Sequence, residues 1–110
     1  MLLYFSATGN GKYLADRLYE REPQEQKSIP VCMRAGEFSF SDESGIGLIV
    51  PTYNFGPPSL VLEFLKNASF ETPYLYLVAS YGTTPGAIGA IVNRAIQGRE
   101  IDAYYSVRMP

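Results

Sequence analysis

The sequence predicts an α/β fold in which helices cover a mainly parallel, doubly wound sheet, and three observations support this prediction. Short apolar runs alternate along the chain with segments of helical periodicity. The connections between them are short, which favours right-handed βαβ crossovers. Irregular segments rich in Gly, Pro, Ser and Thr follow three of the apolar runs, where a doubly wound sheet places its ligand crevice.

The first strand and helix follow from the N-terminal residues. Residues 2–5 are apolar enough for a strand that is buried on both faces. Residues 10–21 predict a helix because Leu14, Ala15 and Leu18 recur at helical spacing.

A second strand is expected over 29–33, at an edge of the sheet because it contains Pro30. Residues 35–44 mix Gly, Ser and acidic side chains, which indicates a surface loop, although a short helix remains open there. Phe38 and Phe40 in this loop are expected to pack down on the domain.

The remaining elements continue the alternation of strand and helix. They are a central strand, a helix, a strand, a helix and a last strand, over 45–50, 59–67, 74–79, 88–98 and 101–107. Apolar residues recur at helical spacing in both helices, and Gly98 is a typical residue for a helix end. The expected sheet has five parallel strands in the order 2-1-3-4-5.

Composition limits the functions that this chain can have. Its 110 residues, 46% hydrophobic and 18% charged, fit one globular domain over residues 1–110. A net charge of -2 with scattered Lys and Arg indicates neither a nucleic-acid partner nor an anionic membrane. One cysteine and no histidine exclude a disulfide framework, a Cys/His zinc site and a Ser-His catalyst within the chain.

The apolar N-terminus is too short for a signal peptide or a membrane segment. We therefore expect a cytoplasmic protein. Cys32 is interpreted as a small buried hydrophobic residue without a redox role.

The segment between the first strand and the first helix predicts a phosphate site. Helix N-termini offer unpaired N–H groups and a positive dipole end to an anion. Hydroxyl and amide side chains add donors, and the two glycines let the backbone approach the ligand. The candidate binding residues here are Ser6, Thr8, Gly9, Asn10, Gly11 and Lys12.

Two other phosphate motifs do not match this segment. A Walker A loop would need Gly at Ser6 and Ser or Thr at Tyr13. The dinucleotide fingerprint G-x-G-x-x-G fails because no third glycine follows Gly9 and Gly11. A turn that only caps the helix remains the alternative interpretation.

Residues 6–11 resemble the phosphate loop of flavodoxins, which reads T/S-x-T-G-x-T after the first strand. Gly11 stands where that family has Thr or Ser, so one hydroxyl contact is lost. The resemblance covers nearly the whole chain. It is closest to the flavodoxin half of bacterial flavodoxin-ferredoxin fusion proteins, through P-T-Y-N-F-G-P-P and the closing Y-S-V-R-M-P.

The resemblance implies a flavodoxin-like fold that binds FMN without a covalent bond. Two further loops would then hold the flavin ring, with Tyr81 and either Tyr53 or Phe55 flanking it. The residues implied in these loops are Pro51, Thr52, Tyr53, Asn54, Phe55 and Gly56, and Ser80, Tyr81, Gly82 and Thr83.

The function implied is electron transfer with a redox partner protein, a reductase or a ferredoxin-type protein, and without a catalytic side chain. Two alternatives stay open: a quinone or flavin reductase that uses NAD(P)H, and an interaction domain that kept the fold without the cofactor.

The family's helix after the last strand has no counterpart up to Pro110, and whether Pro110 is the natural terminus or a point of truncation stays open. The link between the second and third strands also looks short for a helix. One face of the sheet is therefore expected to be partly uncovered and open to a homodimer or another partner.

Overall fold

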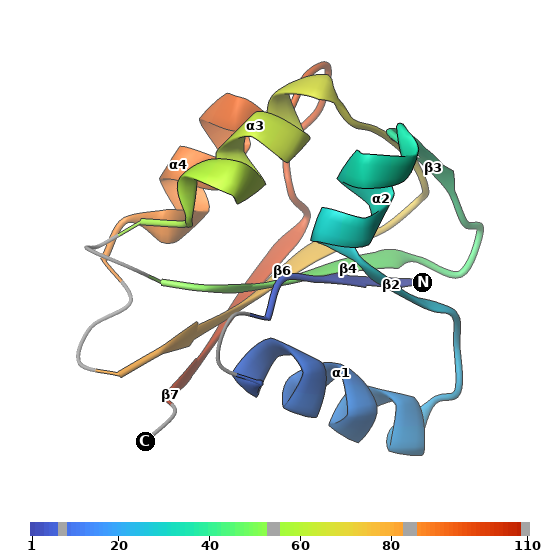
Figure 1. Cartoon of the computed structure of the whole chain (residues 1–110), viewed down its shortest axis with the longest axis vertical. Helices are drawn as coiled ribbons and strands as arrows, with labels where there is room; N and C mark the ends of the chain where they lie inside the picture. The colour runs from blue at the N-terminus through green and yellow to red at the C-terminus, as the bar shows by residue number, and fades with distance from the viewer. Residues whose placement is uncertain (7–8, 53–55, 83–85, 109–110) are drawn as a thin grey trace.

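The computed structural model describes residues 1–6, 9–52, 56–82 and 86–108. Over these residues the larger sheet has five strands in the order β2-β1-β4-β6-β7 (Figure 1). Their bounds are Leu2–Tyr4 for β1, Gln26–Ser28 for β2, Ile46–Pro51 for β4, Leu75–Tyr81 for β6 and Ala103–Arg108 for β7. Every neighbouring pair is parallel, which confirms the five-stranded parallel sheet. Counted along the chain within this sheet, the strands lie in the order second, first, third, fourth, fifth.

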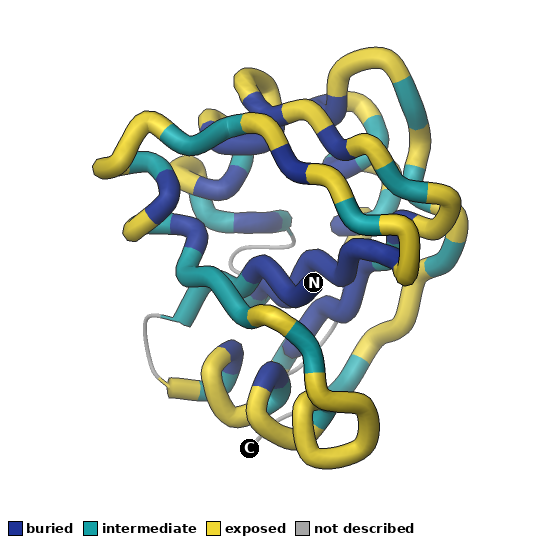
Figure 2. Tube along the Cα trace, turned by 90° about the vertical axis from the view of Figure 1, so that its right-hand side faces the viewer, coloured by how far each residue is buried: buried dark blue, intermediate teal, exposed yellow. Residues whose placement is uncertain are grey.

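Four helices of the described chain cover the two faces of this sheet unequally. They are α1 (Asn10–Arg21), α2 (Ile29–Ala35), α3 (Ser59–Asn67) and α4 (Ile88–Ala95). Helix α1 lies alone on one face, and α2, α3 and α4 lie on the other (Figure 1). The buried residues follow the strands through the middle of the molecule, while the outer side of α1 is exposed (Figure 2).

The two faces accordingly carry two hydrophobic cores. The larger core joins the sheet to α2, α3 and α4 and includes Leu3, Leu48, Phe64 and Leu77, each 1% exposed or less. The smaller core lies under α1, and its buried residues are Leu2, Ala15, Ile49 and Val78. Burial of apolar side chains on both faces explains why the central strands β1 and β4 are nearly continuous hydrophobic runs.

The second strand was placed wrongly by the sequence. The strand β2 ends at Ser28, and the predicted strand 29–33 is the start of helix α2. Pro30 fits the start of a helix, because the N–H that proline lacks would have no partner within the helix there, and the fixed φ of proline suits the helix. Ile29 and Cys32 share the buried side at helical spacing while Val31 is 52% exposed. This helix also corrects the expectation that the link between the second and third strands is too short for one.

The predicted surface loop 35–44 contains a strand that the sequence did not reveal. Strand β3 (Ser39–Ser41) pairs in parallel with β5 (Ser69–Glu71) to form a separate two-stranded sheet. Its paired residues Phe40 and Phe70 are buried with ring centroids 5.9 Å apart. The expected inward packing of Phe38 and Phe40 is confirmed, since both rings contact Phe64 of α3.

Helix α4 ends earlier than predicted, at Ala95, and Gly98 lies beyond it with φ of +80°. The other predicted helices match the observed bounds, Asn10–Arg21 and Ser59–Asn67. None of the helices in the described ranges has the length and hydropathy that a membrane span requires.

Candidate functional site

The carboxyl ends of β1, β4 and β6 lie side by side at one edge of the larger sheet. Backbone bonds continue past the strand ends: the Phe5 N–H donates to the Ile49 carbonyl at 2.9 Å, and the Thr52 N–H donates to the Ser80 carbonyl at 2.8 Å. The three predicted binding segments therefore start next to one another, as Figure 1 shows at the left edge of the sheet. The three segments meet because the strands are parallel and lie in this order. In the sequence, only the alternation of strands and helices indicated that order.

The N-terminus of α1 opens onto this edge. Gly9 precedes the helix with φ of +93°, a left-handed conformation that favours glycine. The Ser6 hydroxyl oxygen accepts a hydrogen bond from the Lys12 N–H at 3.2 Å. The N–H groups of Asn10 and Gly11 have no partner among the described residues. Together with the positive end of the helix dipole, they are donors for an anion.

Gly11 has a packing role that sequence reasoning missed. It is buried, and a Cβ at this position would overlap the carbonyl oxygen of Phe5 and lie 3.3 Å from the Cβ of Ser6. The Thr or Ser expected from the flavodoxin pattern would therefore require α1 to move away from β1. Glycine here brings the first turn of the helix against the end of the strand.

Lys12 contributes its backbone to this region, but its side chain is held elsewhere. Its ammonium donates to the Asp16 carboxylate at 2.9 Å and to the Gln26 side-chain carbonyl at 3.0 Å. The hydrogen bond between Lys12 and Asp16 raises the pKa of Lys12 and lowers the pKa of Asp16. This exposed ion pair lies along the helix surface and leaves anion binding to uncharged groups.

The second segment begins where β4 ends at Pro51. The Thr52 hydroxyl oxygen is buried and has no hydrogen-bond partner within the described part of the chain. A buried hydroxyl normally has a partner, so this group is a candidate contact for a ligand. A Cβ at Gly56 would lie 3.3 Å from Cδ1 of Ile91 in α4, a close approach that the end of the Ile91 side chain would have to relieve.

The third segment starts at the end of β6. Ser80 is only 4% exposed, Tyr81 is half-buried and Gly82 is exposed. Tyr81 lies opposite Arg108 of β7 in the sheet register. Five predicted site residues lie outside the described residues: Thr8, Tyr53, Asn54, Phe55 and Thr83.

The charge of these segments suits an anion. Residues 6–12, 51–58 and 80–88 contain no Asp or Glu, so no carboxylate in them repels a negative ligand. The described donors are backbone N–H groups, hydroxyls and an amide, which bind phosphate without a counter-charge.

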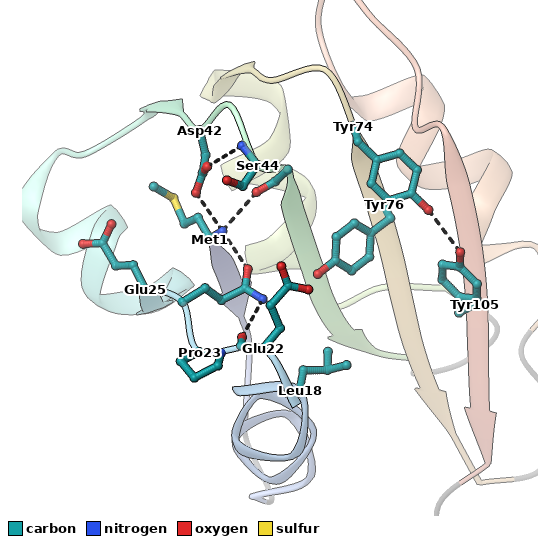
Figure 3. Close-up of a pocket in the computed structure, with 12 residues that line it drawn as sticks. Met1, Leu18, Glu22, Pro23, Glu25, Asp42, Ser44, Tyr74, Tyr76 and Tyr105 are labelled. Carbon is teal, nitrogen blue, oxygen red and sulfur yellow. Dashed lines mark hydrogen bonds and ion pairs between the residues drawn. The ribbon is translucent and has the colours of Figure 1, made fainter. Parts of the chain in front are cut away.

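A separate cavity of about 470 Å³ lies near the other end of the strands, beside α1 (Figure 3). The Met1 ammonium donates there to the Gln24 side chain at 2.7 Å, to Asp42 at 2.9 Å and to the Gly45 carbonyl at 3.0 Å. The hydrogen bond from this ammonium lowers the pKa of Asp42. The cavity shares no residue with the predicted site.

Cys32 lies in α2 and not in a strand, and it is 2% exposed. Burial, with a smaller effect from Glu37, raises the pKa of its thiol to about 11. A thiol with so high a pKa is a poor nucleophile near neutral pH. Among the described residues, no cluster of Cys, Asp and Glu is arranged to hold a metal ion.

The sequence matches no protein-family model and no curated protein.

Proposed function

We propose that this chain is an FMN-binding electron-transfer domain of flavodoxin-like fold. The observation that carries the proposal is the meeting of the α1 N-terminus with the ends of β4 and β6 at one edge of a parallel sheet. The order second, first, third, fourth, fifth is that of flavodoxin-like folds, whose ligand lies beyond the carboxyl ends at the point where the strand order reverses. In this chain that point lies between β1 and β4.

The phosphate of FMN would lie against the first turn of α1. The N–H groups of Asn10 and Gly11 face no described partner, and Gly9 supplies the left-handed turn before them. Ser6 and Thr8 would add hydroxyl contacts. The absence of Asp and Glu from all three segments supports a dianionic phosphate here.

The flavin ring would lie between the second and third segments. The buried Thr52 hydroxyl without a described partner fits a polar edge of the ring, and half-buried Tyr81 fits a stacking contact. Tyr53 or Phe55 would flank the other side, with Pro51, Asn54, Gly56, Ser80, Gly82 and Thr83 contributing backbone around the ring. When bound, FMN supplies the redox chemistry, and these residues orient the ring and exclude water from it.

Electron transfer is the role that this site supports better than catalysis on a substrate. A carrier needs no acid–base side chain because the flavin itself gains and loses the electrons. The charged side chain of the first segment offers little to a reductase, because Lys12 is paired with Asp16. We propose a reductase or a ferredoxin-type protein as the redox partner, in the cytoplasm.

Calorimetry with FMN and with riboflavin tests this proposal. We expect FMN to bind with one-to-one stoichiometry and riboflavin to bind at least tenfold more weakly, because riboflavin lacks the phosphate that the α1 N-terminus would hold. Tyr81→Ala should weaken FMN binding by about tenfold through the lost stacking contact. Tyr19→Ala is the matched control, since Tyr19 is 45% exposed near the far end of α1.

The proposal would be refuted if the folded chain gave no heat of binding with FMN and carried no flavin absorption after gel filtration with FMN. An interaction domain without cofactor would then remain.

A second assay separates the carrier from the enzyme. The FMN-loaded protein should not oxidise NADPH with a quinone by itself and should accept electrons once a separate flavodoxin reductase is added. Rapid turnover by the chain alone would favour the quinone or flavin reductase.

A further inference from the structure

The cavity in Figure 3 lies near the amino ends of the strands, at the other end of the sheet from the proposed flavin site. Its walls come from the end of α1, the segment after it, the turn before β4, and three tyrosines on or next to β6 and β7. The charged groups in its lining are the carboxylates of Glu22, Glu25 and Asp42 and the Met1 ammonium. Aromatic rings together with an excess of negative charge suit an organic cation.

Glu22 has the one carboxylate of these three that lacks a partner in the described part of the chain. Asp42 accepts a hydrogen bond from the Met1 ammonium at 2.9 Å, and Glu25 lies 3.9 Å from the Lys27 ammonium. The Glu22 side chain forms no hydrogen bond or ion pair with a described residue. The cavity therefore keeps one unpaired negative charge.

The position of Glu22 does not serve the helix. Glu22 is the C-cap of α1, and its backbone N–H donates to the Leu18 carbonyl at 3.0 Å. A carboxylate there lies at the negative end of the helix dipole, which destabilises the helix. Residues that stand against a local preference are expected at functional sites. The Glu22 charge also acts on the cavity, since it is, after burial, the next cause that raises the pKa of Tyr76.

Tyr76 provides an aromatic surface in this cavity. Its ring lies over Gly47 of β4, where a Cβ would overlap Cζ and the hydroxyl oxygen of Tyr76. Glycine inside a central strand weakens the strand, and here it leaves room for the ring against the sheet. The ring stacks on Tyr74 with centroids 5.4 Å apart and meets the Tyr105 ring at 78° and 6.4 Å. A hydrogen bond of 3.0 Å between the Tyr74 and Tyr105 hydroxyls holds these two rings together.

The Tyr76 hydroxyl is the second polar group of the cavity without a hydrogen-bond partner among the described residues. Figure 3 shows it directed toward the Glu22 carboxylate. A primary ammonium has three donors, so it can donate to both oxygens while it lies against a ring face. A Ca²⁺ or Mg²⁺ ion would need more oxygen ligands, and the described residues arrange no metal-binding cluster of acidic side chains.

We propose that this cavity binds a primary ammonium on a short apolar chain, with the nitrogen between the Glu22 carboxylate and the Tyr76 hydroxyl. The chain would lie along half-buried Leu18 and the exposed ring of Tyr105, which also line the cavity. Free alkylamines have this chemistry, and so does lysine, whose four-carbon side chain ends like n-butylammonium. The inference does not depend on FMN binding, because the cavity shares no residue with the proposed flavin site.

NMR titration of the backbone amide resonances with n-butylammonium chloride tests the proposal. We expect a dissociation constant of about 1–10 mM, because the free carboxylate is solvent-exposed. The shifts should be largest at residues 18–25 and 74–76. The neutral alcohol 1-butanol has the same chain and should bind at least tenfold more weakly. Tetramethylammonium has the charge but no donor, and should bind about threefold more weakly.

Glu22→Gln removes the charge and keeps the shape of the side chain. It should raise the dissociation constant for n-butylammonium by about tenfold. Glu20→Gln is the matched control, because Glu20 is exposed on the same helix and does not line the cavity; it should change the constant by less than about twofold. Tyr76→Phe keeps the ring, removes the hydroxyl acceptor and should raise the constant by about threefold.

Urea unfolding separates binding from a structural role of Glu22. The midpoint for Glu22→Gln should equal or exceed that of the wild type, because the substitution removes a negative charge from the C-terminal end of α1. A lower midpoint would assign Glu22 a structural role and count against the proposal.

The tripeptide Ac-Gly-Lys-Gly-amide identifies the source of the ammonium. Binding at least tenfold tighter than that of n-butylammonium would point to a lysine of another protein, and equal or weaker binding to a free amine. The proposal would be overturned by an absence of shifts at about 50 mM n-butylammonium, by equal binding of 1-butanol, or by unchanged binding to Glu22→Gln.

Discussion

At the scale of single residues, Gly11 shows how one position can be judged differently by sequence and by structure. In the flavodoxin pattern this position carries Thr or Ser, so Gly11 implies the loss of one hydroxyl contact to a phosphate. In the structure it is the point where the first turn of α1 meets the Phe5 carbonyl. Glycine is needed at this position because the backbones of α1 and β1 approach closely. A local sequence pattern does not indicate this contact, because a loop separates the two segments.

Gly11→Ala should destabilise the protein by about 2 kcal/mol, because the added Cβ would overlap a backbone oxygen that cannot rotate away. Helix propensity alone predicts the opposite sign, since alanine is favoured over glycine in a helix by about 1 kcal/mol. Urea unfolding followed by circular dichroism measures the difference. Gly82→Ala is the control, because a Cβ at Gly82 has no described atom within 4 Å; it should change the free energy of unfolding by less than about 0.5 kcal/mol.

At the scale of elements, Phe64 of α3 joins the helix layer to the two-stranded sheet. Its ring centroid lies 6.0 Å from that of Phe38, 5.7 Å from Phe40 and 6.4 Å from Phe70. The small sheet β3-β5 has only three residue pairs, too few to be stable alone. Its position is therefore maintained by this aromatic cluster.

Phe64→Ala should lower the free energy of unfolding by about 3–5 kcal/mol, as expected for a large side chain removed from a packed core. Leu60→Ala in the same helix is the control, because Leu60 is 38% exposed and should cost about 1 kcal/mol or less. Thermal unfolding of the two variants compares them. Similar losses for both would mean that the cluster does not anchor α3.

The second strand shows why the sequence predicted the wrong element type at residues 29–33. Residues 26–28 are polar in sequence and only three long, so they show no strand pattern, although they pair with β1 in the structure. Pro30 is compatible with a strand edge and with a helix start. Only the packing of Ile29 and Cys32 against the larger core selects the helix.

At the scale of the whole molecule, the carboxyl edge of the sheet brings together segments that lie up to about seventy residues apart in the chain, as βαβ topology dictates. A ligand held by all three segments would bind the folded chain and not the unfolded one. Binding and global stability are then linked.

FMN should therefore raise the free energy of unfolding, by about 2.7 kcal/mol when free FMN is at 100 times its dissociation constant. Riboflavin at the same concentration should raise it less, because its binding lacks the phosphate contact. Denaturant unfolding at constant temperature, with and without each flavin, measures both effects. An equal shift from the two flavins would place the ligand away from the α1 N-terminus.

The sequence by itself determined the α/β class, four of the five parallel strands of the larger sheet, and the start of the three candidate segments at strand ends. These depend on hydrophobic periodicity and on glycine and proline, which act over a few residues. Only the tertiary structure decided the helix at 29–35, the small sheet β3-β5 and the packing role of Gly11. Each of these depends on contacts between segments distant in the chain, and a local pattern does not specify which backbone or core such a segment will meet.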